Sequence, residues 1–445
     1  MGAITRAEVG IDARRHYHAL LESMPRERLA ELQRSRLNAT LANAHANVPF
    51  HRARLDAAGI GAGPVGSLDE LSRLPFTVKA DLRDQYPFGL FARKAKSLAR
   101  LHASSGTTGK PTVVGYTQRD LETWADLMAR SMFAGGARRG DVVHNAYGYG
   151  LFTGGLGAHA GAERLGAVVV PVSGGSTERQ VALIMDFGAR VLCATPSYAL
   201  AIAEVAEQQG VDLRRSALAV GLFGAEPWSA AMRREIESRL GLKAIDVYGL
   251  SEIMGPGVAC ECEFQAGLHG WEDHFLFEVI DPESGRPVPE GEAGELVITT
   301  LTKEALPMLR YRTRDMTTIT TAPCNCGRTH LRILRVTGRN DDMLIVRGVN
   351  VYPSQLEAVL VGRPRVAPHY QVVVDRHGSL DHVTLEVEAR VGVAPEDFER
   401  LARDVAHHVK SLVGISVDVA VKGPGEIPRS QGKAVRVRDL RPKGN

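Results

Sequence analysis

The feature that most constrains this chain is an alternation of apolar and amphipathic segments between residues 100 and 300. Apolar runs rich in Val and Ile fall at residues 167–172, 190–196, 218–226 and 244–251, and amphipathic segments fall at residues 176–189 and 229–241. Short apolar runs that alternate with amphipathic segments are typical of a parallel sheet with crossover helices. The pattern therefore predicts an α/β fold.

Different patterns flank this region. Apolar positions at helical spacing predict helices over the first hundred residues, and turn-forming residues between strand-like runs at 279–300 predict hairpins or a small barrel. A new α+β order begins after Gly338, starting with one strand at residues 343–351. Because 445 residues exceed one ordinary core, we expect a large N-terminal domain at 1–338, with parallel sheets, helices and a small β-barrel-like part, and a small C-terminal domain at 339–445.

Composition excludes several classes of protein. A hydrophobic content of 44%, a charged content of 24% and a net charge of +3 are ordinary for an enzyme and argue against a nucleic-acid partner. The longest apolar stretches are far shorter than the roughly 20 residues of a membrane span. The N-terminus carries charges throughout and has no apolar core of a secretory signal. We therefore expect a cytoplasmic protein that does not bind membranes.

The strongest local motif is the loop HASSGTTGKPTVV at residues 102–114. Gly106 and Gly109 let the backbone approach a ligand closely, hydroxyl and N–H groups can donate to phosphate oxygens, and Lys110 adds a positive charge. The spacing is not that of a Walker A motif, and a flexible Ser/Gly turn is the alternative. The loop predicts a polyphosphate site.

This loop resembles the phosphate-binding signature of the adenylate-forming superfamily, which contains acyl-CoA synthetases, nonribosomal adenylation domains and luciferases. Four further segments resemble superfamily motifs in the expected order: 223–227, 246–252, 311–315 and 338–342. The chemistry agrees, since Tyr248 offers a face for adenine, Glu252 a carboxylate for Mg²⁺ and Asp315 an acceptor for ribose hydroxyls. Arg339 can neutralise charge at the α-phosphate. Each residue alone would be a surface ion pair more often than a ligand contact.

The resemblance implies specific site residues. The catalytic set is Lys433, Arg339 and Glu252, with Glu252 as the Mg²⁺ ligand. The ATP/AMP site comprises Ser104, Ser105, Gly106, Thr107, Thr108, Gly109, Lys110, Gly224, Ala225, Glu226, Pro227, Asp246, Tyr248, Gly249, Ser251 and Asp315. The C-terminal domain is implied to be mobile and to rotate about Asp341, presenting Lys433 for adenylation and its opposite face for coenzyme A.

Further segments resemble one branch, the phenylacetate–CoA ligases, from about Arg36 to the end: 147–159, 249–258, 271–275, 302–315 and 347–357. Asn350 stands where many superfamily members carry arginine, a difference that this branch shares. The resemblance implies an aromatic acid, ATP, Mg²⁺ and coenzyme A as ligands, a role in aromatic acid catabolism, and a homodimer. The implied acyl pocket is Tyr147, Tyr149, Phe152, Gly155 and Met254, although its aromatic residues are equally compatible with plain core positions.

Two alternatives to this activity remain open from the motifs. An enzyme that adenylates a benzoate-type or anthranilate-type acid and loads it onto a carrier protein would carry the same motifs. A nucleotide-binding regulator without chemistry is disfavoured, because Lys433, Glu252 and Asp315 are all present.

The five cysteines are too few and too clustered for a disulfide framework in a chain of 445 residues. Cys262 and His269 precede the Cys324/Cys326 pair, which suggests a structural Cys₃His zinc site closed by protein ligands. Some phenylacetate–CoA ligases hold zinc with a similar set. Cys260 or His330 could replace one ligand, and free reduced thiols are the alternative to a metal site.

Overall fold

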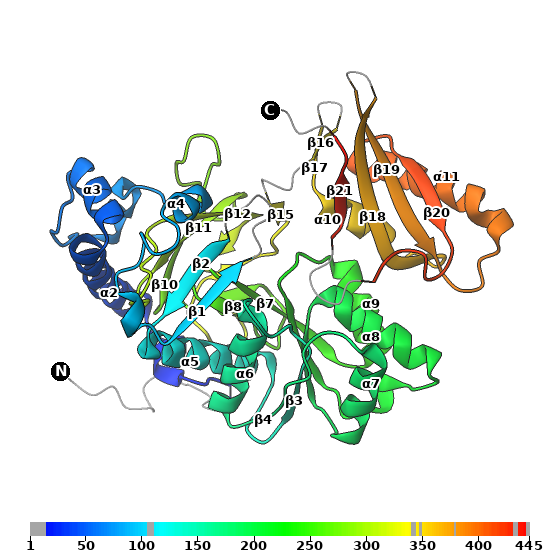
Figure 1. The fold of residues 1–445 in the computed structure, drawn as a ribbon, viewed down its shortest axis with the longest axis horizontal. Helices are drawn as coiled ribbons and strands as arrows, with labels where there is room; N and C mark the ends of the chain where they lie inside the picture. Colours follow the sequence, from blue (N-terminus) through cyan, green and yellow to red (C-terminus); the bar gives the residue numbers. More distant parts are fainter. Residues whose placement is uncertain are drawn as a thin grey trace.

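The computed structural model describes residues 15–104, 111–339, 344–346, 349–377, 380–429 and 435–441. A larger N-terminal part carries the central sheet, and a smaller C-terminal part lies above helices α8 and α9 (Figure 1). Among the described residues, no helix is both long and apolar enough to cross a membrane.

A nine-stranded sheet forms the centre of the N-terminal part, in the order β13-β14-β9-β8-β7-β6-β5-β3-β4. Its parallel strands are β3 (Val142–Asn145), β4 (Val168–Val170), β5 (Val191–Ala194), β6 (Val220–Gly224) and β7 (Lys243–Leu250). Antiparallel strands extend it: β8 (Gly255–Glu261), β9 (Leu268–Gly270), β13 (Ile319–Thr320) and β14 (Arg332–Ile333). The predicted α/β class is confirmed.

Helices cover both faces of this sheet. They are α5 (Gln118–Gly135), α6 (Thr153–Leu165), α7 (Thr177–Asp186), α8 (Pro196–Gln208) and α9 (Ala230–Leu240). Successive side chains of a strand point to opposite faces, so Val191 and Cys193 of β5 join the core with α5 and α6, whereas Leu192 and Ala194 join the core with α7, α8 and α9. Strand β5 is therefore apolar at every position.

The rest of the N-terminal part packs against this unit. It contains α1 (Ala19–Glu22), α2 (Arg26–Asn47), α3 (Pro49–Ala57), η1 (Leu68–Arg73), α4 (Lys79–Asp84), η2 (Ala95–Ser97), β1 (Arg100–Ser104) and β2 (Thr112–Tyr116). The expected barrel-like part is a four-stranded antiparallel sheet of β10 (Phe275–Ile280), β11 (Gly294–Thr300), β12 (Tyr311–Thr317) and β15 (Gly338–Arg339). The helical lead-in and the hairpins were both predictable from the sequence pattern.

The C-terminal part has its own apolar core. Its elements are β16 (Leu344–Val346), β17 (Val349–Val351), α10 (Pro353–Leu360), β18 (Val366–His377), β19 (Leu380–Ala389), η4 (Pro395–Asp397), α11 (Phe398–Val413), β20 (Asp418–Lys422) and β21 (Val437–Asp439). The single strand predicted at 343–351 is wrong, because β16 and β17 pair as a hairpin with two residues between Val346 and Val349. Strand β21 was not predicted, since three residues carry no periodic signal. The domain limits 1–338 and 339–445 stay a prediction.

Candidate active site

Three of the predicted side chains meet where β7, β12 and β15 lie together. The Tyr248 hydroxyl donates a hydrogen bond to Asp315 Oδ2 at 2.5 Å, and Arg339 Nη1 lies 3.8 Å from Asp315 Oδ1. The register of β12 and β15 sets Asp315 directly opposite Arg339. Burial and the charge of Asp315 raise the pKa of Tyr248 well above its ordinary value, so the phenol stays a donor.

A bulge in β12 shapes the approach to Asp315. Between the pairs Glu295–Met316 and Val297–Arg312, β12 has three residues opposite the single Leu296 of β11. Arg314 adopts a left-handed φ of 67° within this bulge. The side chains of Arg312 and Arg314 form ion pairs with the buried carboxylate of Glu295. Both arginines alternate with Asp315 along β12 and so point to the opposite face of the strand.

Glu252 follows β7 and is buried, with 6% of its surface exposed. Lys79 Nζ lies 3.9 Å from its carboxylate. The pKa of Tyr311 is raised, first by burial and then by the negative charge of Glu252, with a further contribution from Asp315. Tyr311 is therefore near both carboxylates, and Glu252 presents an oxygen ligand of the kind that a hard cation requires.

The turn that carries Glu252 is held by buried donors. Every second carbonyl between residues 252 and 256 accepts a side-chain hydrogen bond: Glu252 from Lys303 Nζ (3.3 Å), Met254 from Tyr116 Oη (3.1 Å) and Pro256 from Trp124 Nε1 (2.9 Å). The donors also contact one another, because the Tyr116 and Trp124 rings stack at 5.0 Å and Lys303 Nζ lies 4.8 Å from the Tyr116 ring centre. Burial lowers the pKa of Lys303 to about 8.

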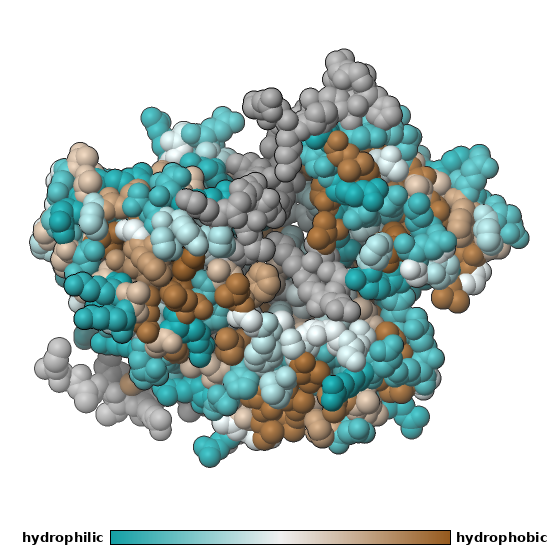
Figure 2. Space-filling model, viewed as in Figure 1, coloured by the Kyte–Doolittle hydropathy of each residue, from teal (hydrophilic) through white to brown (hydrophobic). Residues whose placement is uncertain are grey.

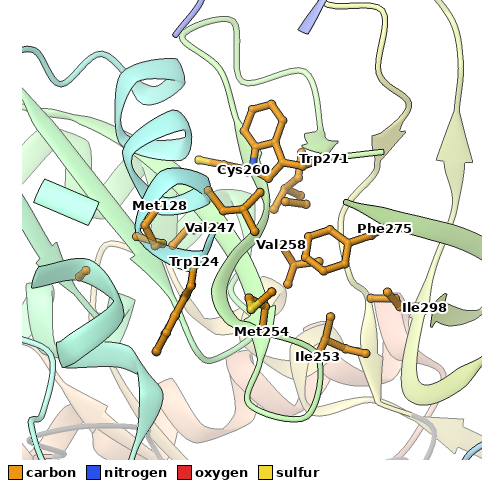
Figure 3. Packing of buried hydrophobic residues seen from close by; sticks show 14 of the residues in the cluster. Trp124, Met128, Val247, Ile253, Met254, Val258, Cys260, Trp271, Phe275 and Ile298 are labelled. Carbon is orange, nitrogen blue, oxygen red and sulfur yellow. The ribbon is translucent and has the colours of Figure 1, made fainter. Parts of the chain in front are cut away.

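Sequence reasoning missed these three donors. Lys303 belongs to the segment 302–315, which carried the family resemblance, but nothing local marks it as a buried cation. Figure 3 shows Trp124 and Met254 among the packed hydrophobic residues of this cluster. Gly249 at the motif's centre is required by packing, since a Cβ there would lie 1.9 Å from the Gly255 carbonyl oxygen.

Two acidic residues predicted for the ATP site lie in other surroundings. Glu226 Oε1 accepts a hydrogen bond from the backbone N–H of Ser197, at the start of α8, at 2.7 Å. Burial, and then the neighbouring Glu261, raise the pKa of Asp246 to about 7. Asp246 borders a cleft of about 450 Å³ that Arg233 and Arg335 also line. Neither residue makes a described contact with the Tyr248–Asp315 pair, and their role in binding ATP stays a prediction.

The remaining predicted ATP-site residues are divided. Gly224 ends β6, and a Cβ at this position would lie 2.2 Å from the Val247 carbonyl oxygen. Ala225 follows with a left-handed φ of 72°, and Pro227 lies two residues further along the chain. The Ser251 hydroxyl lies 3.0 Å from that of Thr153. Ser104 pairs with Thr112 at the end of the β1–β2 hairpin that adjoins the connecting segment. The others lie outside the described residues: Ser105, Gly106, Thr107, Thr108, Gly109, Lys110, Asp341 and Lys433.

The predicted acyl-pocket residues differ in exposure. Tyr147 is buried and its hydroxyl donates to the Leu222 carbonyl oxygen at 3.2 Å, and Met254 is fully buried. The hydroxyl of the half-buried Tyr149 accepts a hydrogen bond from Asn145 Nδ2 at 2.7 Å. Phe152, immediately before α6, is 54% exposed. Gly155 packs so closely that a Cβ would lie 2.5 Å from the carbonyl oxygen of Gly148.

The four predicted metal ligands form one cluster. The ligand atoms of Cys262, His269, Cys324 and Cys326 all lie within 4.8 Å of one another. Cys262 Sγ lies 3.8 Å from Cys324 Sγ, and Cys326 Sγ lies 3.3 Å from His269 Nε2. Tetrahedral zinc with Zn–S bonds of about 2.3 Å would separate two sulfurs by about 3.8 Å, so the donor set fits this ion.

The surroundings of the cluster favour a thiolate at Cys326. Hydrogen bonds from Cys262 and His269 lower the pKa of Cys326 against the effect of burial. The hydrogen bond to Cys326 and burial raise the pKa of Cys262, and burial raises that of Cys324. Arg328 is buried beside these sulfurs and donates to Glu22 at 2.7 Å. The alternative ligands lie elsewhere, because Cys260 Sγ faces the Ser131 carbonyl oxygen and both ring nitrogens of His330 face backbone carbonyls.

Comparison with known proteins agrees with this geometry. The family model described as AMP-binding enzyme matches residues 32–302, and the model of the AMP-binding enzyme C-terminal domain matches residues 348–441. The fold and the site therefore define an AMP-binding enzyme with its C-terminal domain. Phenylacetate-coenzyme A ligase of Thermus thermophilus is 53% identical over 442 residues, covering 96% of this chain and 99% of that protein. The enzyme of the same name from Escherichia coli is 52% identical, covering 95% and 97%.

The chain belongs to the phenylacetate–CoA ligase family of adenylate-forming enzymes. It is thus an AMP-forming acid–thiol ligase, and ATP and coenzyme A are substrates of its family.

Solved structures of one relative distinguish two arrangements of the domains. A 2-hydroxyisobutyryl-CoA ligase in the postadenylation state, in complex with 2-HIB-AMP, is 30% identical and superposes with a TM-score of 0.91 over 98% of this chain and 94% of that one. The same ligase in the thioesterification state with CoA is 31% identical and gives 0.71 over 99% and 94%. The arrangement of this chain therefore resembles the postadenylation state.

Proposed function

We propose that the protein converts phenylacetate, ATP and coenzyme A into phenylacetyl-CoA, AMP and pyrophosphate. The observation that carries this proposal is the identity of 53% and 52% to two phenylacetate–CoA ligases over nearly the whole of each chain. Relatives this similar over nearly their whole length are expected to act on the same class of acid.

The first step is adenylation. A carboxylate oxygen of the acid bonds to the α-phosphorus of ATP, and the bond from that phosphorus to the bridging oxygen breaks as pyrophosphate leaves. Asp315 would accept hydrogen bonds from the ribose hydroxyls, with its carboxylate oriented by Tyr248 at 2.5 Å. Arg339 would balance the charge that develops at the α-phosphate. Glu252 would hold Mg²⁺, which shields the charge of the ATP phosphates.

The second step transfers the acyl group. The coenzyme A sulfur attacks the carbonyl carbon of the acyl-adenylate, the acyl–phosphate bond breaks and AMP leaves. Rotation about Asp341 would withdraw Lys433 between the two steps. The TM-scores of 0.91 and 0.71 against two states of one relative support a movable C-terminal part.

The aromatic ring would bind near Tyr149, Phe152 and Gly155, with Tyr147 and Met254 shaping the pocket from behind. The exposed ring of Phe152 and the half-buried ring of Tyr149 support this placement, because both can contact a ligand without unpacking the core.

The Cys₃His cluster would hold a structural zinc ion. All four donors are side chains of this chain, so no position stays open for a reacting water. The ion would tie the loop after β8 to the loop between β13 and β14.

A homodimer is also part of the proposal. Figure 2 shows hydrophobic residues gathered at the edge of the molecule where Figure 1 draws β4 and α6, and Val168 of the edge strand β4 is 57% exposed. Exposed apolar strand edges favour association. The cytoplasmic location stays a prediction.

The direct test measures pyrophosphate release across a panel of aromatic acids, with and without coenzyme A, on protein whose zinc content has been counted. Turnover of phenylacetate that requires coenzyme A is expected. Activation of a benzoic or anthranilic acid followed by transfer to a carrier-protein thiol would instead support the carrier-loading alternative.

A further inference from the structure

Charged and polar groups make much of the contact between the two parts of the molecule. Figure 1 shows the C-terminal part resting over α8 and α9. The described bonds across this contact join Arg429 to Glu204 (2.8 and 2.7 Å), Arg390 to Glu235 (2.9 Å), Arg436 to Ser197 Oγ (3.0 Å) and Glu357 to the Ser229 backbone N–H (2.7 Å). Such bonds can be exchanged for water when the two parts separate.

Arg429 links two carboxylates that belong to different parts. Its guanidinium donates to both oxygens of Glu204 on α8, at 2.8 and 2.7 Å, and to both oxygens of Glu388 on β19, at 2.6 and 2.7 Å. A planar guanidinium matches carboxylates in this two-bond geometry, and each charged bond is stronger than a neutral one. Separation of the parts would leave the pair with Glu388 intact and break only the pair with Glu204.

Glu204 is ionised throughout the physiological range. Burial by itself would raise its pKa, but the interactions with His369 and Arg429 lower it to about 2. His369 Nε2 lies 3.4 Å from this carboxylate and, like Arg429, belongs to the C-terminal part. The negative charge of Glu204 on α8 is therefore balanced by Arg429 of the C-terminal part when the two parts are in contact.

The position of Arg429 in the chain connects this contact to the chemistry. Arg429 and Arg436 flank the segment 430–434, in which Lys433 lies. Their partners Glu204 and Ser197 are both on α8, seven residues or about 10 Å apart along the helix axis. Arg436 also packs over the Tyr370 ring at 4.5 Å. Both ends of the lysine segment are thus anchored to one helix of the N-terminal part.

We propose that Arg429 and Arg436 are positioning residues for adenylation: they tie both flanks of the segment 430–434 to α8 in the arrangement seen here, which resembles the postadenylation state, and release it for thioester formation. This inference rests on the proposed two-step function and adds the residues that hold one of its two states. The hydrogen bonds of Arg429 and Arg436 join the C-terminal part to α8, so their loss should slow adenylation, the step that needs this contact.

The test uses Glu204→Gln, which removes the charge on α8 and leaves the pair of Arg429 with Glu388 in place. Adenylation is measured as phenylacetate-dependent exchange of pyrophosphate into ATP, and transfer as consumption of supplied phenylacetyl-AMP with coenzyme A. Adenylation is expected to fall about 10-fold, which corresponds to about 1.4 kcal/mol, while transfer stays unchanged. Glu204→Asp, which keeps a carboxylate, is expected to recover part of the lost exchange.

The matched control is Glu207→Gln. Glu207 is on the same helix and makes the same two-bond pair, at 2.8 and 2.7 Å, but with Arg239 of the N-terminal part. It is expected to change neither half-reaction. An equal loss of both half-reactions in Glu204→Gln, or no loss in either, would overturn the proposal.

A measurement without substrate tests the anchor independently of whether phenylacetate is the substrate. Small-angle X-ray scattering of the full chain should show a broader distance distribution for Glu204→Gln than for the wild type or for Glu207→Gln. Identical distributions would count against the anchor. If the wild type fails to exchange pyrophosphate with phenylacetate, the proposed substrate is wrong, and the scattering comparison still tests the anchor.

Discussion

The site around Asp315 and the contact along α8 and α9 are built from different interactions. Asp315 and Arg339 are placed by the register of two strands, and the turn of Glu252 is fixed by three buried donors. The contact between the two parts includes apolar packing of Val361, but its described hydrogen bonds come from charged and polar groups. Asp315, the proposed ribose acceptor in both reaction steps, lies on a strand, whereas the residues proposed to position only adenylation lie on a surface that can open.

The physical reason is the free energy of separation. Exposing apolar surface costs about 25 cal/mol per Å², so a large apolar contact would resist the rotation proposed for the second step. Ion pairs at a partly exposed surface contribute about 1 kcal/mol each, and slightly more in a two-bond arginine–carboxylate pair, because water can replace them. A polar contact therefore lets the C-terminal part dock specifically and still leave.

The sharpest test of this contrast is Asp315→Ala. It should lower both half-reactions about 1,000-fold, or about 4 kcal/mol, because the ribose loses its acceptor and the Tyr248 hydroxyl loses its partner. The same two assays used for Glu204→Gln measure the effect. A loss confined to adenylation would place Asp315 with the contact instead of the fixed site.

Removal of the metal cluster should affect stability and leave the balance between the steps unchanged. Cys324→Ser is expected to abolish zinc binding and to lower the free energy of unfolding by about 3 kcal/mol, because two loops lose their cross-link. Metal analysis and thermal unfolding measure this effect. The control Cys260→Ser changes a neighbouring cysteine outside the cluster and should keep one zinc per chain; zinc that survives in Cys324→Ser would contradict the ligand assignment.

Acid should weaken the interior of the N-terminal part before it weakens the contact. Burial lowers the pKa of His51 to about 4, against 6.5 in the unfolded chain, so the unfolded state takes up the proton first as the pH falls. Stability should decrease by about 2 kcal/mol between pH 7 and pH 5 from this group. Glu204, with a pKa of about 2, stays charged over that range.

Thermal unfolding of the wild type and of His51→Gln across this range measures the effect of the histidine. The variant should show the shallower dependence on pH. Equal slopes would assign the acid sensitivity to other groups.

Salt should give the smallest effect, confined to the contact. Raising the ionic strength from about 0.05 to 0.5 M should slow adenylation about threefold relative to transfer, because the partly exposed pairs Arg429–Glu204 and Arg390–Glu235 are screened. The ratio of the two half-reaction rates is the quantity to follow. Parallel salt dependence of both rates would mean that the contact does not select one step.

The sequence by itself determined the α/β class, the ordered motifs and the metal cluster. Alternating apolar runs report which strands are buried on both faces, and this pattern is local. Cys262, His269, Cys324 and Cys326 were identifiable because few other roles suit that residue set in a chain with five cysteines. Tyr248, Asp315 and Arg339 were placed together by their motifs and meet in the structure.

Only the tertiary structure decided how these residues are supported. Lys303, Tyr116 and Trp124 come from separate segments, and no local pattern shows that they donate to one turn. The same holds for Arg429 and Glu204, which are 225 residues apart in the chain. Local patterns fix which faces are buried, but a pair between distant segments depends on how the elements pack, and that packing exists only in the folded chain.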